Sequence, residues 1–148
     1  MITASPGRII DILLVEDDPG DELITREAFQ DNKIKNTLHV ARDGQEGLDF
    51  LYRRGPYRDA PTPDLILLDL NLPKYDGRQL LEKIKSDTRL CHIPVVVLTT
   101  SSSEEDILRS YKLHANAYVT KPVDLDQFMK AVREIDEFFV QVVRLPQS

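Results

Sequence analysis

Polar side chains that can bind metal ions or phosphate stand directly after several short apolar runs of this sequence. Three runs end in the acidic segment 16–18, in Asp69 and in Thr99–Thr100, and a further run is followed by Lys121. If these runs are parallel strands, their carboxyl ends meet at one edge of a sheet, where ligands bind. Crowded carboxylates repel one another unless a cation or a proton joins them. The pattern therefore predicts carboxylates, a hydroxyl group and an ammonium group gathered around a bound cation.

The chemistry expected of such a cluster is transfer of a phosphoryl group. Carboxylate oxygens and waters are the ligands that Mg²⁺ prefers. A carboxylate beside the metal can attack phosphorus, while Lys121 and one of the two threonine hydroxyls bind the phosphoryl oxygens. Asp69 is the favoured nucleophile, because its run is the central one and the Glu16–Asp17 pair ends the neighbouring run. The alternation of side chains does not choose between Thr99 and Thr100.

Apolar runs and amphipathic segments alternate along the chain and predict the elements that position these residues. The runs are Ile9–Val15, Leu38–Ala41, Leu65–Leu68, Val95–Leu98 and Ala117–Val119. Runs so short and unbroken are typical of strands buried on both faces of a parallel sheet. Helical spacing follows each run, near residues 20–31, 48–52, 80–84, 107–111 and from 125 onward. This order predicts a doubly wound α/β domain with a five-stranded parallel sheet and five helices. Asp18, directly before Pro19, is interpreted as a helix cap rather than a metal ligand.

The composition indicates one globular domain and excludes several classes of protein. The chain has 148 residues, 41% of them hydrophobic and 30% charged, with a net charge of −6. This charge, without a basic patch, argues against nucleic-acid binding, and the single Cys91 excludes an internal disulfide. No run of about 18 apolar residues occurs, so a soluble, cytoplasmic protein without membrane attachment is expected. Residues 1–8 are expected to be a flexible tail and residues 9–148 a single domain.

The segments LLVEDDPGD, LILLDLNLPKYDG, IPVVVLTTS and AYVTKPV resemble, in order and spacing, the receiver domain of two-component response regulators. The resemblance covers residues 9 to 140 and implies the flavodoxin-like receiver fold. It implies that Asp69 accepts a phosphoryl group from a phosphohistidine of a sensor histidine kinase in a Mg²⁺-dependent reaction. Such a domain catalyses only its own phosphorylation and dephosphorylation, so an enzyme acting on other substrates is not expected.

The same resemblance implies a role for each remaining site residue. Asp17 and Asp69 bind Mg²⁺ directly, Glu16 acts mostly through water, and Asn71 offers its main-chain carbonyl. Thr99 is the switch hydroxyl, Lys121 the catalytic lysine, and Tyr118 the aromatic side chain that reorients on activation. The Lys121–Pro122 peptide bond is expected to be cis.

Within this family, the chain resembles small regulators partnered with cyanobacterial and bacterial phytochromes. The segments that carry the narrower resemblance are KYDGR, GPYRDAPTP and FFVQVVRLP. They imply a phytochrome-type histidine kinase as partner, and the alternative is a stand-alone receiver of another two-component or phosphorelay system. An unphosphorylated binding module and a Mg²⁺-dependent phosphohydrolase are less consistent with the residues. Such hydrolases usually carry a second acid two residues after the nucleophile, where this chain has Asn71.

The C-terminal segment predicts how the signal leaves the protein. Only residues 144–148 follow the expected fifth helix, so no output domain is expected and the signal passes by protein contact. Phe138, Phe139, Val142 and Leu145 extend this helix with more apolar surface than one face needs. The excess predicts a two-fold homodimer through the fifth strand, the fifth helix and the tail. The alternative is that these side chains complete the core.

Overall fold

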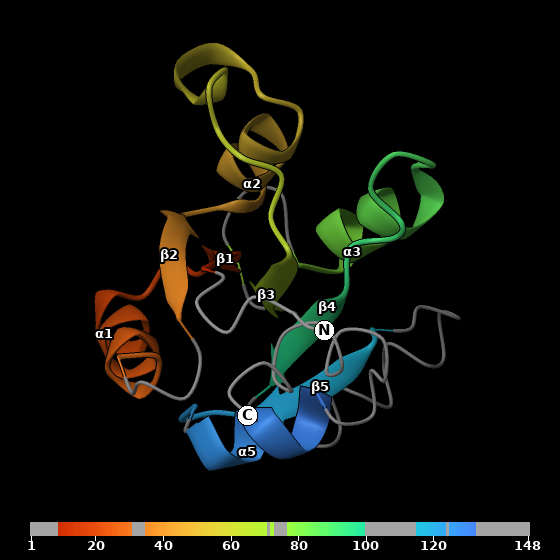
Figure 1. Ribbon diagram of the computed structural model, residues 1–148. Coiled ribbons are helices and arrows are strands. Elements are labelled where there is room, and N and C mark those ends of the chain that lie inside the picture. The colour runs from red at the N-terminus through yellow and green to blue at the C-terminus, as the bar shows by residue number, and fades with distance from the viewer. Residues whose placement is uncertain are drawn as a thin grey trace, which may run out of the picture.

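In the computed structural model of this protein, five strands form one parallel sheet in the order β2-β1-β3-β4-β5 (Figure 1). The structure describes residues 9–30, 35–70, 72, 77–99, 115–123 and 125–132, with the backbone alone at 125, 131 and 132. The strands are β1 (Ile10–Val15), β2 (Asn36–Ala41), β3 (Leu65–Asp69), β4 (Val95–Thr99) and β5 (Ala117–Thr120). Each strand lies within two residues of the predicted apolar run, so the parallel sheet is confirmed.

Helices follow the strands as expected in a doubly wound domain. They are α1 (Pro19–Ala28), α2 (Gly44–Leu51), α3 (Gly77–Ser86) and α5 (Leu125–Val132), with a short 3₁₀ helix η1 at Gly55–Tyr57. The helix predicted near 107–111, the tail 1–8 and the extension of the fifth helix beyond 132 lie outside the described residues. Among the described helices, none combines the length and the apolar character that crossing a membrane requires.

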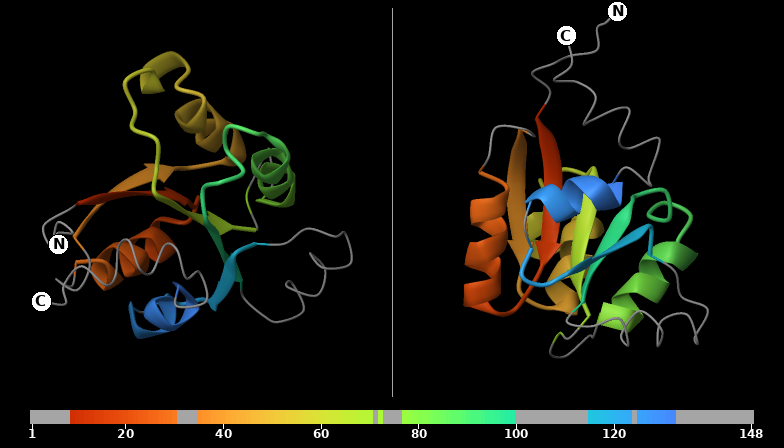
Figure 2. Two further views of the ribbon diagram at one scale, coloured as in Figure 1. Left: turned by 45° about the vertical axis from the view of Figure 1, so that its right-hand side comes forward. Right: turned by 90° about the horizontal axis from the view of Figure 1, so that it is seen from below.

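Two of the described helices cover each face of the sheet (Figure 2). Helices α1 and α5 cover one face, where Phe29 and Phe128 pack edge to face with ring centroids 4.7 Å apart. Helices α2 and α3 cover the other face, where Leu80 packs with Leu68 and neighbouring apolar side chains. Because successive side chains of a strand point to opposite faces, both alternating sets must be apolar. The unbroken apolar runs of the sequence follow from this arrangement.

The turn between β1 and α1 is fixed by a helix cap. The side chain of Asp18 accepts a hydrogen bond from the Gly20 N–H at 3.1 Å, and Pro19 occupies the first turn of α1. Both features are typical of helix starts, so the interpretation of Asp18 as a cap is confirmed. The cap leaves Glu16 and Asp17 in the short segment between the end of β1 and the start of α1.

Candidate functional site

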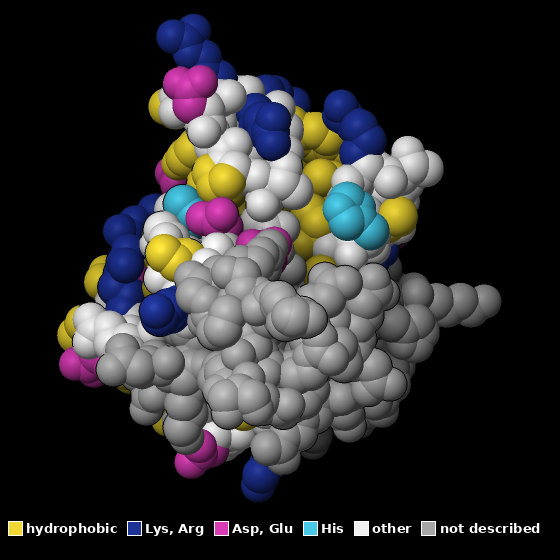
Figure 3. Space-filling view, in the orientation of Figure 1, with side chains coloured by type: hydrophobic (Ala, Val, Ile, Leu, Met, Phe, Trp, Pro, Cys, Tyr) yellow, Lys and Arg dark blue, Asp and Glu magenta, His cyan; other side chains and the backbone are white. Residues whose placement is uncertain are grey.

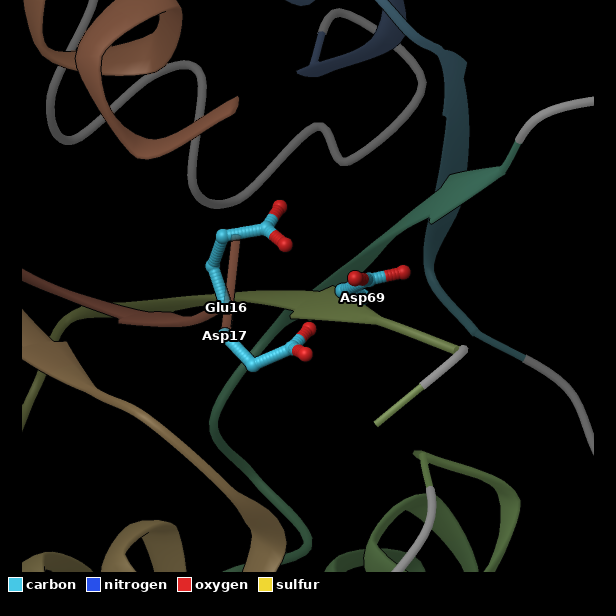
Figure 4. A group of neighbouring side chains, drawn as sticks. All are labelled: Glu16, Asp17 and Asp69. Atoms are coloured by element: carbon cyan, nitrogen blue, oxygen red, sulfur yellow. The ribbon is translucent and has the colours of Figure 1, made fainter. Parts of the chain in front are cut away.

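Three carboxylates meet at the carboxyl ends of the neighbouring strands β1 and β3. Glu16 and Asp17 follow β1, and Asp69 ends β3, which pairs with β1 in the register Val15 to Leu68. One carboxylate oxygen of each residue lies within 4.8 Å of the other two (Figure 4). Glu16 and Asp69 are buried, whereas Asp17 is exposed. The register of two neighbouring strands thus brings together residues that are about fifty positions apart in the chain.

Lys121 follows β5 and extends its ammonium group into this cluster. Its Nζ lies 2.9 Å from Glu16 Oε1, 2.9 Å from Asp21 Oδ2 and 3.1 Å from Asp69 Oδ2. The Lys121 backbone N–H donates to the Thr99 carbonyl at 2.8 Å, which ties the end of β5 to the end of β4. The Lys121–Pro122 peptide bond is cis, as expected. Lys121 therefore faces the acidic residues of β1 and β3 from the far strand of the sheet.

Burial and neighbouring charges shift the pKa values of Glu16 and Lys121. Burial raises the pKa of the Glu16 carboxyl to about 7, and the neighbouring Asp69 adds to the increase while Lys121 opposes it. Burial alone would lower the pKa of Lys121, but Glu16, Asp21 and Asp69 together raise it above its ordinary value. Lys121 thus stays an ammonium group at neutral pH. Among the described residues of the site, Lys121 is the cation that pairs with Glu16, Asp21 and Asp69, so the carboxylates outnumber it.

The donor set of this cluster fits a hard divalent cation. All the candidate ligand atoms are carboxylate oxygens, which such cations prefer. Glu16 Oε1 is fully buried, and no described residue donates a well-aligned hydrogen bond to it, although Lys121 Nζ is 2.9 Å away. A buried oxygen without a donor has capacity for another positive partner. Glu16, Asp17 and Asp69 are therefore placed as a metal site requires, while Asn71, predicted as a fourth ligand, lies outside the described residues.

Thr99 and Tyr118, the two residues expected to act as a switch, lie on β4 and β5. Thr99 is buried at the end of β4, and β4 pairs with the Asp69 strand. Tyr118 is half-buried on β5, where it packs on the side of α2 and α3 and its hydroxyl oxygen accepts from the Ala115 N–H at 3.3 Å. Thr100 lies outside the described residues, so Thr99 is the one of the two threonines that the structure places at this edge.

Two further residues shape the site and were not predicted from the sequence. Asp21, in the first turn of α1, binds the ammonium group of Lys121. Gly77, at the start of α3, packs so closely on the chain after β3 that a Cβ atom would lie 2.5 Å from the Asp69 carbonyl oxygen. The position of Asp21 three residues after Asp18, which caps α1, is the feature of the sequence that could have indicated its contact with Lys121. Nothing local distinguishes Gly77 from an ordinary turn glycine.

Comparisons with known proteins agree with this geometry. The family described as "response regulator receiver domain" matches residues 12–133. Response regulator Rcp1 of Synechocystis sp. is 47% identical over 145 residues, which are 98% of this chain and 97% of Rcp1. The solved Mn²⁺-bound form of Rcp1 superposes with a TM-score of 0.71 at 45% identity and covers 89% of this chain and 95% of its own. The phosphorylated cyanobacterial phytochrome response regulator RcpA gives a TM-score of 0.73 at 47% identity, over 90% of this chain and 95% of RcpA.

Proposed function

This chain belongs to the family of response regulator receiver domains, and on that premise we propose that Asp69 is its phosphoryl acceptor. The donor is a phosphohistidine of a sensor histidine kinase, and the reaction depends on Mg²⁺. The observation that carries the proposal is the contact of 3.1 Å between Lys121 Nζ and Asp69 Oδ2, beside the carboxylates of Glu16 and Asp17. A nucleophile, a cation for phosphoryl oxygens and a metal-binding carboxylate set thus share one edge of the sheet.

The transfer needs one bond to form and one to break. A carboxylate oxygen of Asp69 attacks the phosphorus atom, and the P–N bond to the donor imidazole breaks with its electron pair left on nitrogen. Lys121 Nζ and the Thr99 hydroxyl donate hydrogen bonds to the phosphoryl oxygens as negative charge spreads over them. Glu16, Asp17, Asp69 and the Asn71 carbonyl would hold Mg²⁺, which neutralises part of that charge when bound.

Dephosphorylation by water returns the protein to its unphosphorylated state. Water attacks the phosphorus atom, the P–O bond to Asp69 breaks, and inorganic phosphate leaves while the Asp69 carboxylate is restored. The protein changes only its own modification in this cycle, so we propose a signalling switch and not an enzyme acting on other substrates. Phosphorylation draws Thr99 toward the phosphoryl oxygens, and Tyr118 then fills the space that Thr99 leaves.

The kinase is proposed to be of the phytochrome type. The names of RcpA and of other similar structures, such as the bacteriophytochrome response regulators RtBRR and AtBRR, support this assignment. A histidine kinase of another two-component or phosphorelay system is the alternative. We place the reaction in the cytoplasm, and nucleic acid is not a proposed partner. The net charge of −6 supports this exclusion, as does the mixture of basic, acidic and apolar side chains that the described residues present on the face seen in Figure 3.

The output is proposed to pass by protein contact, with a second copy of the chain as one partner. The apolar residues at 138–145 of the sequence support a symmetric contact that also involves β5 and α5. Apolar burial contributes about 25 cal/mol per Å², and exposed charges are screened beyond about 8 Å at physiological salt. A charge introduced at Phe139 should therefore dissociate the dimer without unfolding the domain. Sedimentation of the wild type as a monomer, with and without phosphorylation, would refute this part of the proposal.

Phosphorylation by acetyl phosphate tests the acceptor directly. With Mg²⁺ the intact mass of the wild type should increase by one phosphoryl group, and a phytochrome-type kinase should produce the same product. Asp69→Asn should gain none, because the amide keeps the shape and loses the nucleophile. Circular dichroism controls for folding of the variant. Uptake of one phosphoryl group by Asp69→Asn at another carboxylate would disprove the assignment.

A further inference from the structure

The ammonium group of Lys121 has a third acidic partner outside the carboxylates of β1 and β3. It donates a hydrogen bond to Asp21 Oδ2 at 2.9 Å, across 100 positions of sequence. An ammonium group has three N–H donors, and three carboxylates already surround this one within 3.1 Å. A phosphoryl oxygen arriving at Asp69 therefore meets an ammonium group that already pairs with three carboxylates, of which Asp21 accepts a hydrogen bond from it. Asp69 itself becomes an acyl phosphate, so Glu16 and Asp21 are the carboxylates that remain to compete with the phosphoryl oxygens for the ammonium group.

Asp21 is the neighbour that can release Lys121 at the lowest cost. Its side chain is 33% exposed, whereas the side chains of Glu16 and Asp69 are 0% and 5% exposed. Water can hydrate a released carboxylate at a partly exposed position, but a buried carboxylate that loses its cation stays unpaired at high cost. Asp21 also lies in the first turn of α1, where the positive end of the helix dipole stabilises a carboxylate without Lys121.

We propose that Asp21 is a positioning residue that holds Lys121 toward α1 and competes with the phosphoryl group for its ammonium. The inference rests on the proposed function, in which Lys121 binds phosphoryl oxygens. Asp21 binds Lys121 in the unphosphorylated protein and gives it up to the phosphoryl group on Asp69. The contact between Asp21 in α1 and Lys121 after β5 thereby lowers the rate at which Asp69 is phosphorylated.

Three variants separate this competition from a general effect of charge. Asp21→Asn keeps the volume but removes the charge that holds Lys121, and Asp21→Glu keeps the charge. Asp18→Asn is the matched control, because it removes one negative charge near the start of the same helix. The side chain of Asp18 accepts from the Gly20 N–H. Asparagine is also a good helix cap, so this control should fold normally.

The rate of phosphorylation by acetyl phosphate at saturating Mg²⁺ is the first measurement. Asp21→Asn should raise the rate constant about two- to fivefold, the range that corresponds to a partly exposed ion pair. It should lower the half-saturating concentration of beryllofluoride, a phosphoryl mimic, by a similar factor. Asp21→Glu should behave like the wild type, and Asp18→Asn should change either value less than twofold. A decrease or no change in Asp21→Asn, or equal increases in both asparagine variants, would overturn the competition.

The ammonium resonance of Lys121 in the unphosphorylated protein is the second measurement. Asp21→Asn should move the ¹⁵Nζ resonance of Lys121, whereas Asp18→Asn should leave it in place. An unmoved resonance in Asp21→Asn would show that Asp21 does not position Lys121. If the wild type takes up no phosphoryl group, the proposed function fails together with the competition. The resonance then still decides whether the contact between Asp21 and Lys121 exists, so the two failures are distinguishable.

Discussion

Replacement of Glu16 by glutamine tests the electrostatics of the site through the pH dependence of stability. Glu16 is fully buried, and burial together with Asp69 raises the pKa of its carboxyl from 4.5 to about 7. Between these pH values the native state holds a proton that the unfolded chain has already released. The free energy of unfolding of the metal-free protein should therefore decrease as the pH rises from 4.5 to about 7. Glutamine cannot ionise, so Glu16→Gln should lack this decrease.

The magnitude follows from the width of the interval. Each pH unit corresponds to 1.36 kcal/mol, so the interval from 4.5 to about 7 gives about 3 kcal/mol. This loss should be fully present above pH 7 and absent below pH 4.5. The pKa of Lys121 is shifted upward from 10.5, so its charge stays constant across the interval and does not mask the effect.

The assay is urea denaturation in EDTA at half-unit steps between pH 4.5 and 8.5. The quantity to follow is the difference in free energy of unfolding between wild type and Glu16→Gln, because it cancels the contributions of the ionisable groups that the two proteins share. Glu22→Gln is a control for which the same difference should stay flat over this pH range. Burial raises the pKa of Glu22, but Arg26 and Arg42 lower it below its ordinary value overall, so its stabilising contribution is lost only as the pH falls below 4.5. A difference between wild type and Glu16→Gln that is flat or increases with pH would refute the reasoning.

Three further predictions concern the metal, the close packing behind the site and the core. Mg²⁺ at 100 times its dissociation constant should stabilise the protein by about 2.7 kcal/mol and raise its melting temperature. Asp17→Ala should remove most of this thermal shift, and Asp18→Ala should remove little of it. Equal losses in the two variants would show that the wrong carboxylate was assigned to the metal. Gly77→Ala should destabilise the protein by about 2 kcal/mol or more in urea titration, because the new Cβ meets backbone atoms at 2.5 Å, whereas Gly20→Ala has its nearest contact at 3.6 Å and should be tolerated. Phe128→Ala should cost about 3–5 kcal/mol in the same titration, because its ring is fully buried, and a cost below about 1 kcal/mol would show that α5 does not pack as described.

The sequence by itself determined the sheet and the edge at which the site lies. A central strand of a doubly covered sheet is apolar at nearly every position, and polar residues follow the end of the run. Glu16, Asp69 and Lys121 each stand at such an end, and parallel strands bring their carboxyl ends to one edge. Periodicity and the polar residues that end each run were therefore enough to predict the sheet and the gathering of these side chains.

Only the tertiary structure decided which atoms meet and how their environment changes them. Asp21 binds Lys121 across 100 residues of sequence, and that contact depends on how the first turn of α1 lies against the end of β5. Gly77 is confined by backbone atoms of residues 69 and 70, which no local pattern reveals. The raised pKa of Glu16 comes mainly from burial and then from the nearby Asp69. A sequence specifies the order and period of its elements, whereas burial and charge contacts depend on distances that exist only once those elements have packed.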